Sequence, residues 1–196
     1  MIDNKKSQIR AYYKTIRSSI THKSEKESII VEKLKTFNAV KNADTVFAYA
    51  ASGSEANIDP LIEYILSLGK TVALPVCSDK FGNMEFYSVE SLEKIKVGMY
   101  SIREPESKGL QPIKSDRNSV CLVPAICFDK SGRRIGYGKG YYDRFLDDFH
   151  GCTIGVNFDE CVTEQIPYDE YDKQVNYLIT DKTIYKFISE EENTYG

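Results

Sequence analysis

Short runs of β-branched and aromatic residues alternate with amphipathic patterns along much of this chain. The runs predict strands at residues 44–50, 71–74, 119–124, 152–156 and 176–180, and one hairpin arm at 84–89. Helical spacing predicts helices at 4–20, 23–37, 59–68 and 141–149. Alternation of this kind favours a largely parallel sheet covered by helices. We therefore expect an α/β fold with a single domain over residues 1–196, ending in a frayed acidic tail from about 189.

Local signals predict where several of these elements begin and end. Ser24, followed three residues later by Glu27, has the pattern of a capping box at the start of the second helix. Pro60 suits the first turn of the third helix, and Gly69 suits the position just after its end. Pro75 has no backbone N–H to donate, so we expect it to end the second strand.

The composition of the chain limits which kinds of partner it is expected to bind. The 29 acidic and 26 basic residues are interspersed and give a formal net charge of −3, whereas a nucleic-acid-binding protein would carry a basic stripe. The N-terminus is polar, and no apolar stretch is long enough to span a bilayer. The five cysteines form no C-x-x-C pair, which is typical of reduced thiols. We expect a cytoplasmic monomer that binds small molecules, without a nucleic-acid or membrane partner.

The most informative segment is residues 122–146, which predicts a strand, a glycine-rich turn and a helix. Gly136, Gly138 and Gly140 alternate, so the backbone can turn tightly and approach a bound group closely. The N-terminus of the following helix offers free N–H groups and a partial positive charge, which suit an anion. Glycines alone are a weak signal, because any tight connection can carry them.

Charged residues in the same segment strengthen the prediction of an anion site. Arg134 and Lys139 add a bidentate fork and a flexible point charge. Asp143, just inside the helix, is placed for a Mg²⁺ ion that bridges phosphate oxygens. Together they predict a polyphosphate site. The spacing is neither that of a P-loop, because Gly140 follows Lys139, nor that of a dinucleotide fingerprint, because the glycines read G-x-G-x-G.

At these residues the sequence resembles the 5-formyltetrahydrofolate cyclo-ligase family, also called methenyltetrahydrofolate synthetase. The family signature, PxxxFD followed by G-x-R-L-G-x-G-x-G-Y-Y-D, is matched by Pro124, Phe128-Asp129 and residues 132–143, with Ile135 in place of leucine. The resemblance extends over nearly the whole chain. It implies a three-layer α/β/α fold related to that of sugar-phosphate isomerases and CoA transferases.

The resemblance also implies roles for individual residues. Lys6 and Arg10 match a K-x-x-x-R helix, whose i and i+4 positions share one face, although such a face is often simply solvated. The implied ATP-binding residues are Lys6, Arg10, Arg134, Gly136, Tyr137, Gly138, Lys139, Gly140, Tyr141 and Tyr142. The implied folate-binding residues are Glu55, Met84, Tyr100, Tyr137, Gly138, Lys139, Gly140 and Tyr141. Asp143 and Asp172 are the implied magnesium ligands, and Arg134, Lys139 and Tyr141 are the expected catalytic residues.

Some of these assignments have alternatives, and the sequence departs from the family at three positions. Met84 could equally belong to the core, Glu55 could be a solvated loop residue, and one of the two adjacent tyrosines is expected to pack in the core. The departures are Ile58 in place of a threonine, Cys161 in place of a glutamine, and Tyr171 where a histidine or asparagine precedes the aspartate.

The implied reaction is the ATP-dependent conversion of 5-formyltetrahydrofolate to 5,10-methenyltetrahydrofolate, with ADP and phosphate released, through a phosphorylated formyl group (an iminium phosphate). Such chemistry requires positioning and charge neutralisation more than a nucleophilic side chain. Two other functions remain open at this point. One is a different small-metabolite enzyme on the same fold, such as a sugar-phosphate isomerase or a kinase. The other is a module that binds nucleotide or folate without catalysis.

Overall fold

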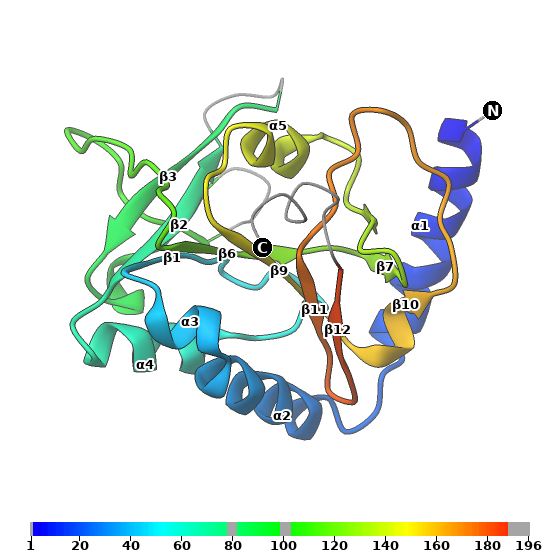
Figure 1. The fold of residues 1–196 in the computed structure, drawn as a ribbon, viewed down its shortest axis with the longest axis horizontal. Helices are drawn as coiled ribbons and strands as arrows, with labels where there is room; N and C mark the ends of the chain where they lie inside the picture. Colours follow the sequence, from blue (N-terminus) through cyan, green and yellow to red (C-terminus); the bar gives the residue numbers. More distant parts are fainter. Residues whose placement is uncertain (1, 78–81, 99–102, 188–196) are drawn as a thin grey trace, which may run out of the picture.

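The computed structural model describes residues 2–77, 82–98 and 103–187, and a seven-stranded sheet runs through its centre (Figure 1). The strand order is β12-β11-β9-β6-β1-β2-β3. The strands from β11 to β2 in this order are parallel, and β12 and β3 close the two edges antiparallel. The bounds are β1 Thr45–Phe47, β2 Thr71–Cys77, β3 Met84–Val89, β6 Ser119–Pro124, β9 Cys152–Val156, β11 Tyr177–Ile179 and β12 Ile184–Lys186. The predicted α/β fold with a mostly parallel sheet is confirmed.

Helices cover both faces of this sheet, which confirms the three layers (Figure 1). Helices α2 (Lys23–Thr36), α3 (Asn38–Asn42) and α4 (Asp59–Ser67) lie on one face and α5 (Tyr141–Asp147) lies on the other. Because side chains alternate along a strand, Val120 and Leu122 of β6 join the core beneath α2 and α4, whereas Cys121 and Val123 join the core beneath α5. The relation to sugar-phosphate isomerases and CoA transferases stays a prediction.

Helix α1 (Ile2–Ser18) stands beside the sheet rather than on either face (Figure 1). Its partly buried Ile9 and Tyr13 pack against Cys127, Ile135 and Ile166. Those residues belong to, or adjoin, a small sheet of β7 (Cys127–Asp129), β8 (Arg134–Ile135) and β10 (Val162–Thr163). A further pair, β4 (Lys96–Val97) and β5 (Arg103–Glu104), lies between β3 and β6, where no strand was predicted. The acidic tail and Tyr100 lie outside the described residues.

The predicted capping box of α2 is wrong. Helix α2 starts at Lys23, and its N-cap is His22, whose φ of 52° is left-handed and whose side chain makes no capping hydrogen bond. Ser24 therefore lies inside the helix. Glu27 accepts a hydrogen bond from the Asn57 N–H (2.9 Å) instead of closing the helix end. A tertiary contact has taken the carboxylate that the local pattern assigned to the cap.

The prediction that Pro75 ends β2 is also wrong. Strand β2 continues through Pro75 to Cys77 and is paired with β3 from Val72 to Cys77. On its other side β2 pairs with β1 only as far as Ala73, because β1 is shorter than the predicted 44–50 and ends at Phe47. Pro75 thus lies where β2 has an open side, the place in a sheet where proline is tolerated.

The carboxyl ends of β1 and β6 meet at one edge of the sheet, because the two strands are neighbours and parallel. The loop after β1 carries Glu55, and the chain after β6 leads through β7 and β8 to the glycine turn. In open α/β sheets ligands bind outside the carboxyl ends of the strands. The fold therefore brings the predicted folate and phosphate residues to the same edge.

Candidate active site

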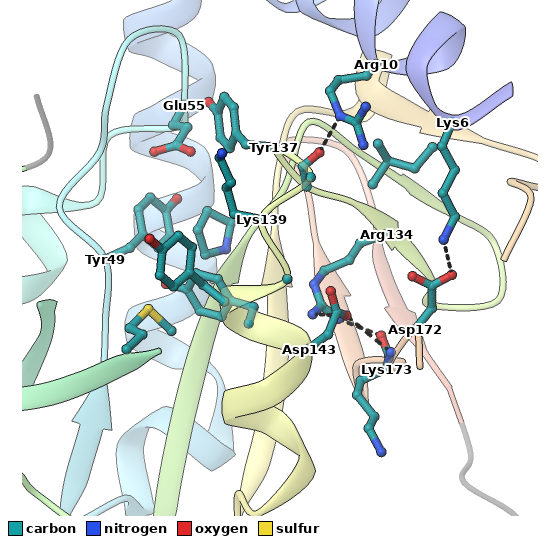
Figure 2. A pocket seen from close by; sticks show the side chains of 18 of the residues that line it. Lys6, Arg10, Tyr49, Glu55, Arg134, Tyr137, Lys139, Asp143, Asp172 and Lys173 are labelled. Carbon is teal, nitrogen blue, oxygen red and sulfur yellow. Dashed lines mark hydrogen bonds and ion pairs between the residues drawn. The ribbon is translucent and has the colours of Figure 1, made fainter. Parts of the chain in front are cut away.

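A cleft of about 1590 Å³ opens at this edge (Figure 2). It lies between α1, the loop after β1, the glycine turn and the turn that contains Asp169 and Asp172. A site for one small molecule usually has a volume of about 300–1000 Å³. The cleft therefore has room for two substrates at once.

The glycine turn joins β8 to α5 and faces the cleft. Gly138 and Gly140 have φ angles of +90° and +70°, which side chains other than glycine rarely adopt. A Cβ at Gly138 would also lie 3.2 Å from the Arg10 guanidinium, whose Nε donates a hydrogen bond to the Gly136 carbonyl (2.9 Å). Arg10 of α1 thus lies directly over the turn. The predicted strand, turn and helix are present, but the hairpin of β7 and β8 separates the long strand β6 from the turn.

A buried carboxylate holds that hairpin. Asp129 is fully buried, and its Oδ1 accepts hydrogen bonds from the Ser131 N–H and hydroxyl and from the Arg133 N–H. Its Oδ2 accepts the Ile166 N–H (3.2 Å). A carboxylate that accepts several N–H groups is well compensated for its burial. The FD dipeptide of the signature is therefore structural, because it fixes the hairpin that leads into the glycine turn.

Lys6 and Asp172, predicted to serve ATP and magnesium, form an ion pair. The Lys6 ammonium lies 2.6 Å from Asp172 Oδ2 and 2.8 Å from Asp169 Oδ2, and the Lys6 side chain is only 13% exposed. Burial is the largest single influence on the pKa of Lys6 and lowers it, but the hydrogen bonds to Asp169 and Asp172 and their negative charges together outweigh burial and raise this pKa. Sequence reasoning missed Asp169, because nothing in the acidic run 169–172 distinguishes one carboxylate from another.

Arg134 and Asp143 form a second pair beside the first (Figure 2). Arg134 Nη2 donates to Asp143 Oδ1 at 2.7 Å, and Nη1 donates to the Lys173 carbonyl at 2.5 Å. The side chains are 4% and 32% exposed, respectively. Arg134 lines the cleft, yet its guanidinium is occupied by protein partners. Its part in binding phosphate stays a prediction.

Lys139 differs from the other cations of the cleft. It is exposed on the glycine turn and extends into the cleft (Figure 2). Within residues 2–77, 82–98 and 103–187, its ammonium has no hydrogen bond or ion pair. A cation without a protein partner is available to an anionic ligand at no cost of breaking a contact.

Tyrosines line the cleft beside the turn. The Tyr49 hydroxyl donates to the Ala56 carbonyl (2.9 Å), whereas the buried hydroxyl of Tyr142 has no hydrogen-bond partner in the described part of the chain. Tyr142 also packs against the core beneath α5, as expected for one of the adjacent tyrosines. Tyr141 lines the cleft as well.

Glu55 is buried beside Tyr137, at the end of the cleft away from the Lys6–Asp172 pair (Figure 2). Its side chain accepts the Ser52 N–H (2.9 Å) and interacts with the Tyr137 hydroxyl. Burial raises the pKa of Glu55, and the Ser52 N–H and the positive charge of Arg17 partly offset this rise. Arg17 is itself 3% exposed. Arg17 follows Arg10 by seven residues, or two helical turns, which predicts a face shared with Lys6 and Arg10. That spacing does not distinguish a buried arginine from an exposed one.

The family model of 5-formyltetrahydrofolate cyclo-ligase matches residues 2–181 of the sequence. This chain belongs to the 5-formyltetrahydrofolate cyclo-ligase family. The resemblance seen in the sequence is thereby confirmed.

Individual relatives agree with the family match. The 5-formyltetrahydrofolate cyclo-ligase of Escherichia coli K12 is 28% identical over 159 residues, which cover 79% of this chain and 87% of that protein. The Mycolicibacterium smegmatis cyclo-ligase is 32% identical over 146 residues, or 70% and 74% of the two chains. The NMR structure of 5,10-methenyltetrahydrofolate synthetase from Aquifex aeolicus is 26% identical and superposes with a TM-score of 0.79, covering 97% and 99% of the two chains.

The remaining predicted folate residues and the three departures from the family pattern lie in different surroundings. Met84 lines the cleft and also packs on the core beneath α5, so its core contact is confirmed and its part in binding folate stays a prediction. Ile58 is fully buried and precedes α4, and Cys161 is fully buried. Tyr171 is 73% exposed, beside Asp172. Tyr100 lies outside the described residues, so its placement stays a prediction.

Proposed function

We propose that this chain catalyses the ATP-dependent ring closure of 5-formyltetrahydrofolate to 5,10-methenyltetrahydrofolate, with release of ADP and phosphate. Membership of a cyclo-ligase family makes the chain a ligase. The observation that carries the assignment is the joint placement of a cation-bearing glycine turn and a buried carboxylate, Glu55, in one cleft large enough for both substrates. The expectation of a monomer stays a prediction. In the described residues, every helix falls short of the length or apolarity needed to cross a bilayer.

The two sides of the cleft suit the two substrates. The Arg10 guanidinium and the unpartnered Lys139 ammonium lie at the glycine turn, where they would contact the outer phosphates of ATP. Glu55 would accept hydrogen bonds from the paired N–H donors of the reduced pterin. Lys6 is neutralised by Asp169 and Asp172, so it would reach a phosphate only if another cation replaced it at these carboxylates.

The carboxylates beside Lys6 fit a magnesium ion. Asp143 uses Oδ1 for Arg134 and the Lys173 N–H, and Asp172 uses Oδ2 for Lys6 and the Asp169 N–H. Each keeps one oxygen that accepts no hydrogen bond from a described residue. Mg²⁺ takes one or two carboxylates together with phosphate oxygens and waters, which agrees with the lack of any three-residue ligand cluster in the described ranges. Asp143 and Asp172 would hold the ion, which would neutralise charge on the phosphates.

Ring closure must expel the formyl oxygen, and oxide is a poor leaving group, so this oxygen must first be phosphorylated. The oxygen of the N5-formyl group attacks the γ-phosphorus of ATP, the bond from that phosphorus to ADP breaks, and an iminium phosphate forms. N10 then adds to the formyl carbon and loses its proton, and phosphate departs with the carbon–oxygen bond electrons to leave the methenyl bridge. Neither step requires a nucleophilic side chain. Lys139, Arg10 and the N–H groups of the turn would stabilise charge on the transferred phosphoryl group, with Arg134 holding Asp143 and Tyr141 lining the reacting end.

The test is an absorbance measurement on the purified chain mixed with 5-formyltetrahydrofolate. The methenyl product is conjugated and absorbs where the substrate does not, so ring closure appears directly. We expect product only when Mg-ATP is present, with ADP released in equal amount. A Glu55→Gln variant should bind ATP normally and show a raised KM for the folate. Binding of both ligands without ADP release would contradict the proposal and indicate a binding module. Product formed without ATP would contradict it as well.

A further inference from the structure

Arg17 is buried at a point where three segments of the cleft meet. It lies in the last turn of α1 and is 3% exposed. Its Nε donates to the Ser54 hydroxyl (2.9 Å), its Nη1 to the Ala125 carbonyl (2.8 Å) and its Nη2 to the Tyr137 hydroxyl (2.6 Å). No carboxylate of the described residues forms a direct ion pair with it. Burial of a guanidinium without such a pair is costly, so packing alone does not account for an arginine here.

The hydrogen bond from Arg17 to Tyr137 sets the donor-to-acceptor direction of a short series of interactions, which runs from Arg17 through the Tyr137 hydroxyl to Glu55. Arginine has only donors, and an ionised carboxylate has only acceptors. Because the Tyr137 hydroxyl accepts from Arg17, its own proton remains for its other neighbour, Glu55. Glu55 also accepts the Ser52 N–H, so the carboxylate interacts with groups from two different loops. Figure 2 shows Tyr137 and Glu55 side by side at the same end of the cleft.

Charged and titratable groups reach Glu55 from every element around it. They are Arg17 of α1, Lys23 of α2, Tyr49 after β1, Tyr137 and Lys139 of the glycine turn, and Tyr142 of α5. Burial is the strongest influence and raises the pKa of Glu55, and Arg17 lowers this pKa more than Lys23 does. Arg17 is therefore the side-chain cation that contributes most to keeping the buried carboxylate charged.

We propose that Arg17 is a positioning residue for the folate, acting through Tyr137 to orient Glu55 as the acceptor for the pterin N–H donors. The inference rests on the proposed function. It adds a residue outside the glycine turn and joins that turn to the folate side of the cleft, because Tyr137 lies between Gly136 and Gly138. Arg17 itself does not contact substrate in this scheme.

The test compares Arg17→Met, Tyr137→Phe and the double variant by steady-state ring-closure kinetics over a range of acidic to neutral pH. Each single variant is expected to raise the KM for 5-formyltetrahydrofolate about tenfold, the effect of losing one hydrogen bond to a charged group, with a smaller change in the KM for ATP. The double variant should have the same KM for 5-formyltetrahydrofolate as Arg17→Met, because both changes break the same series of interactions between Arg17, Tyr137 and Glu55. In Arg17→Met the acidic limb of kcat/KM should move to higher pH by about one unit.

Two further variants separate the effect of the positive charge of Arg17 from the effect of its hydrogen bonds. Lys14 lies one turn earlier on α1, with its ammonium 5.3 Å from the centre of the Tyr137 ring and no hydrogen bond to a described residue. Lys14→Met removes a positive charge from beside the same ring but leaves the interactions between Arg17, Tyr137 and Glu55 intact. The acidic limb of its kcat/KM profile should therefore stay in place. Arg17→Lys keeps the charge without the forked donor, so it should restore the acidic limb more fully than the KM.

The outcomes distinguish this inference from the proposed function. Additive effects of Arg17→Met and Tyr137→Phe, or an acidic limb that does not move, would mean that Arg17 only anchors α1. If Arg17→Met does not fold, Tyr137→Phe decides, because Tyr137 is half exposed and loses only its hydroxyl. An unchanged folate KM in that variant would overturn the inference. Absence of ATP-dependent ring closure in the wild-type chain would instead overturn the proposed function, and this inference with it.

Discussion

Replacement of Lys139 by methionine should remove a phosphate contact while leaving the fold intact. Lys139 is exposed, lines the cleft and has no ion pair or hydrogen bond from its ammonium within the described ranges. Methionine keeps most of the aliphatic stem and loses only the charge. Surface substitutions of this kind change the free energy of unfolding by about 0.5 kcal/mol or less. A loss of activity in this variant would therefore report on the reaction rather than on folding.

The expected loss follows from the strength of one charge-assisted hydrogen bond. Such a bond to a phosphate contributes about 1.5–3 kcal/mol. If it is made in the transition state, kcat/KM for ATP should fall about 10- to 150-fold, at 1.36 kcal/mol for each factor of ten. Complete loss is not expected from this bond alone, because Arg10 remains over the turn. Arg134 would be a less clear test, because its removal also leaves Asp143 without its buried partner.

The assay is the initial rate of ring closure at varied ATP, with melting temperature measured on the same samples. Lys114→Met is the matched control, because Lys114 is also exposed and unpaired within the described chain but lies outside the cleft. The control should match the wild type in both measurements. An unchanged kcat/KM for ATP in Lys139→Met would refute the phosphate assignment. A melting temperature that falls in parallel with activity would refute the claim that Lys139 has no structural role.

Three other perturbations test the surroundings of the cleft. Tyr142→Phe should leave the protein equally stable or up to about 1 kcal/mol more stable in urea unfolding, because it removes a buried hydroxyl without a described partner; clear destabilisation would contradict this. Lys6→Met should lower the melting temperature at neutral pH, with the gap between variant and wild type narrowing as pH falls below the ordinary aspartate pKa. The reason is that the Lys6 hydrogen bond lowers the pKa of Asp169, so its stabilisation is present above the ordinary aspartate pKa and lost as pH falls through the lowered one; a gap that widens in acid would show the sign to be wrong. Asp172→Asn should raise the magnesium concentration for half-maximal rate at least about tenfold, and an unchanged midpoint would remove Asp172 from the metal site.

Local patterns in the sequence were sufficient for much of the fold. The strands at 119–124, 152–156 and 84–89 have the predicted bounds, and Gly69 follows α4 with a φ of +73°. These elements are set by short-range physics, because β-branched runs, turn glycines and helix ends depend on neighbours a few residues away. The errors at Ser24 and Pro75 have the opposite origin. In both, a partner distant in sequence determined whether the local preference applied.

The same distinction between local patterns and contacts distant in sequence applies to the candidate site. The sequence alone was sufficient to find the glycine turn, its cations and its carboxylate, because the turn is a contiguous segment whose residue types already predict an anion site. Only the tertiary structure paired Lys6 with Asp172, 166 residues away, and buried Arg17 against Tyr137, 120 residues away. Helix α1 has the same basic residues whether or not it docks on the small sheet of β7, β8 and β10. Which of its cations are buried, paired or exposed depends on that docking, through long-range packing and the loss of water around each charge.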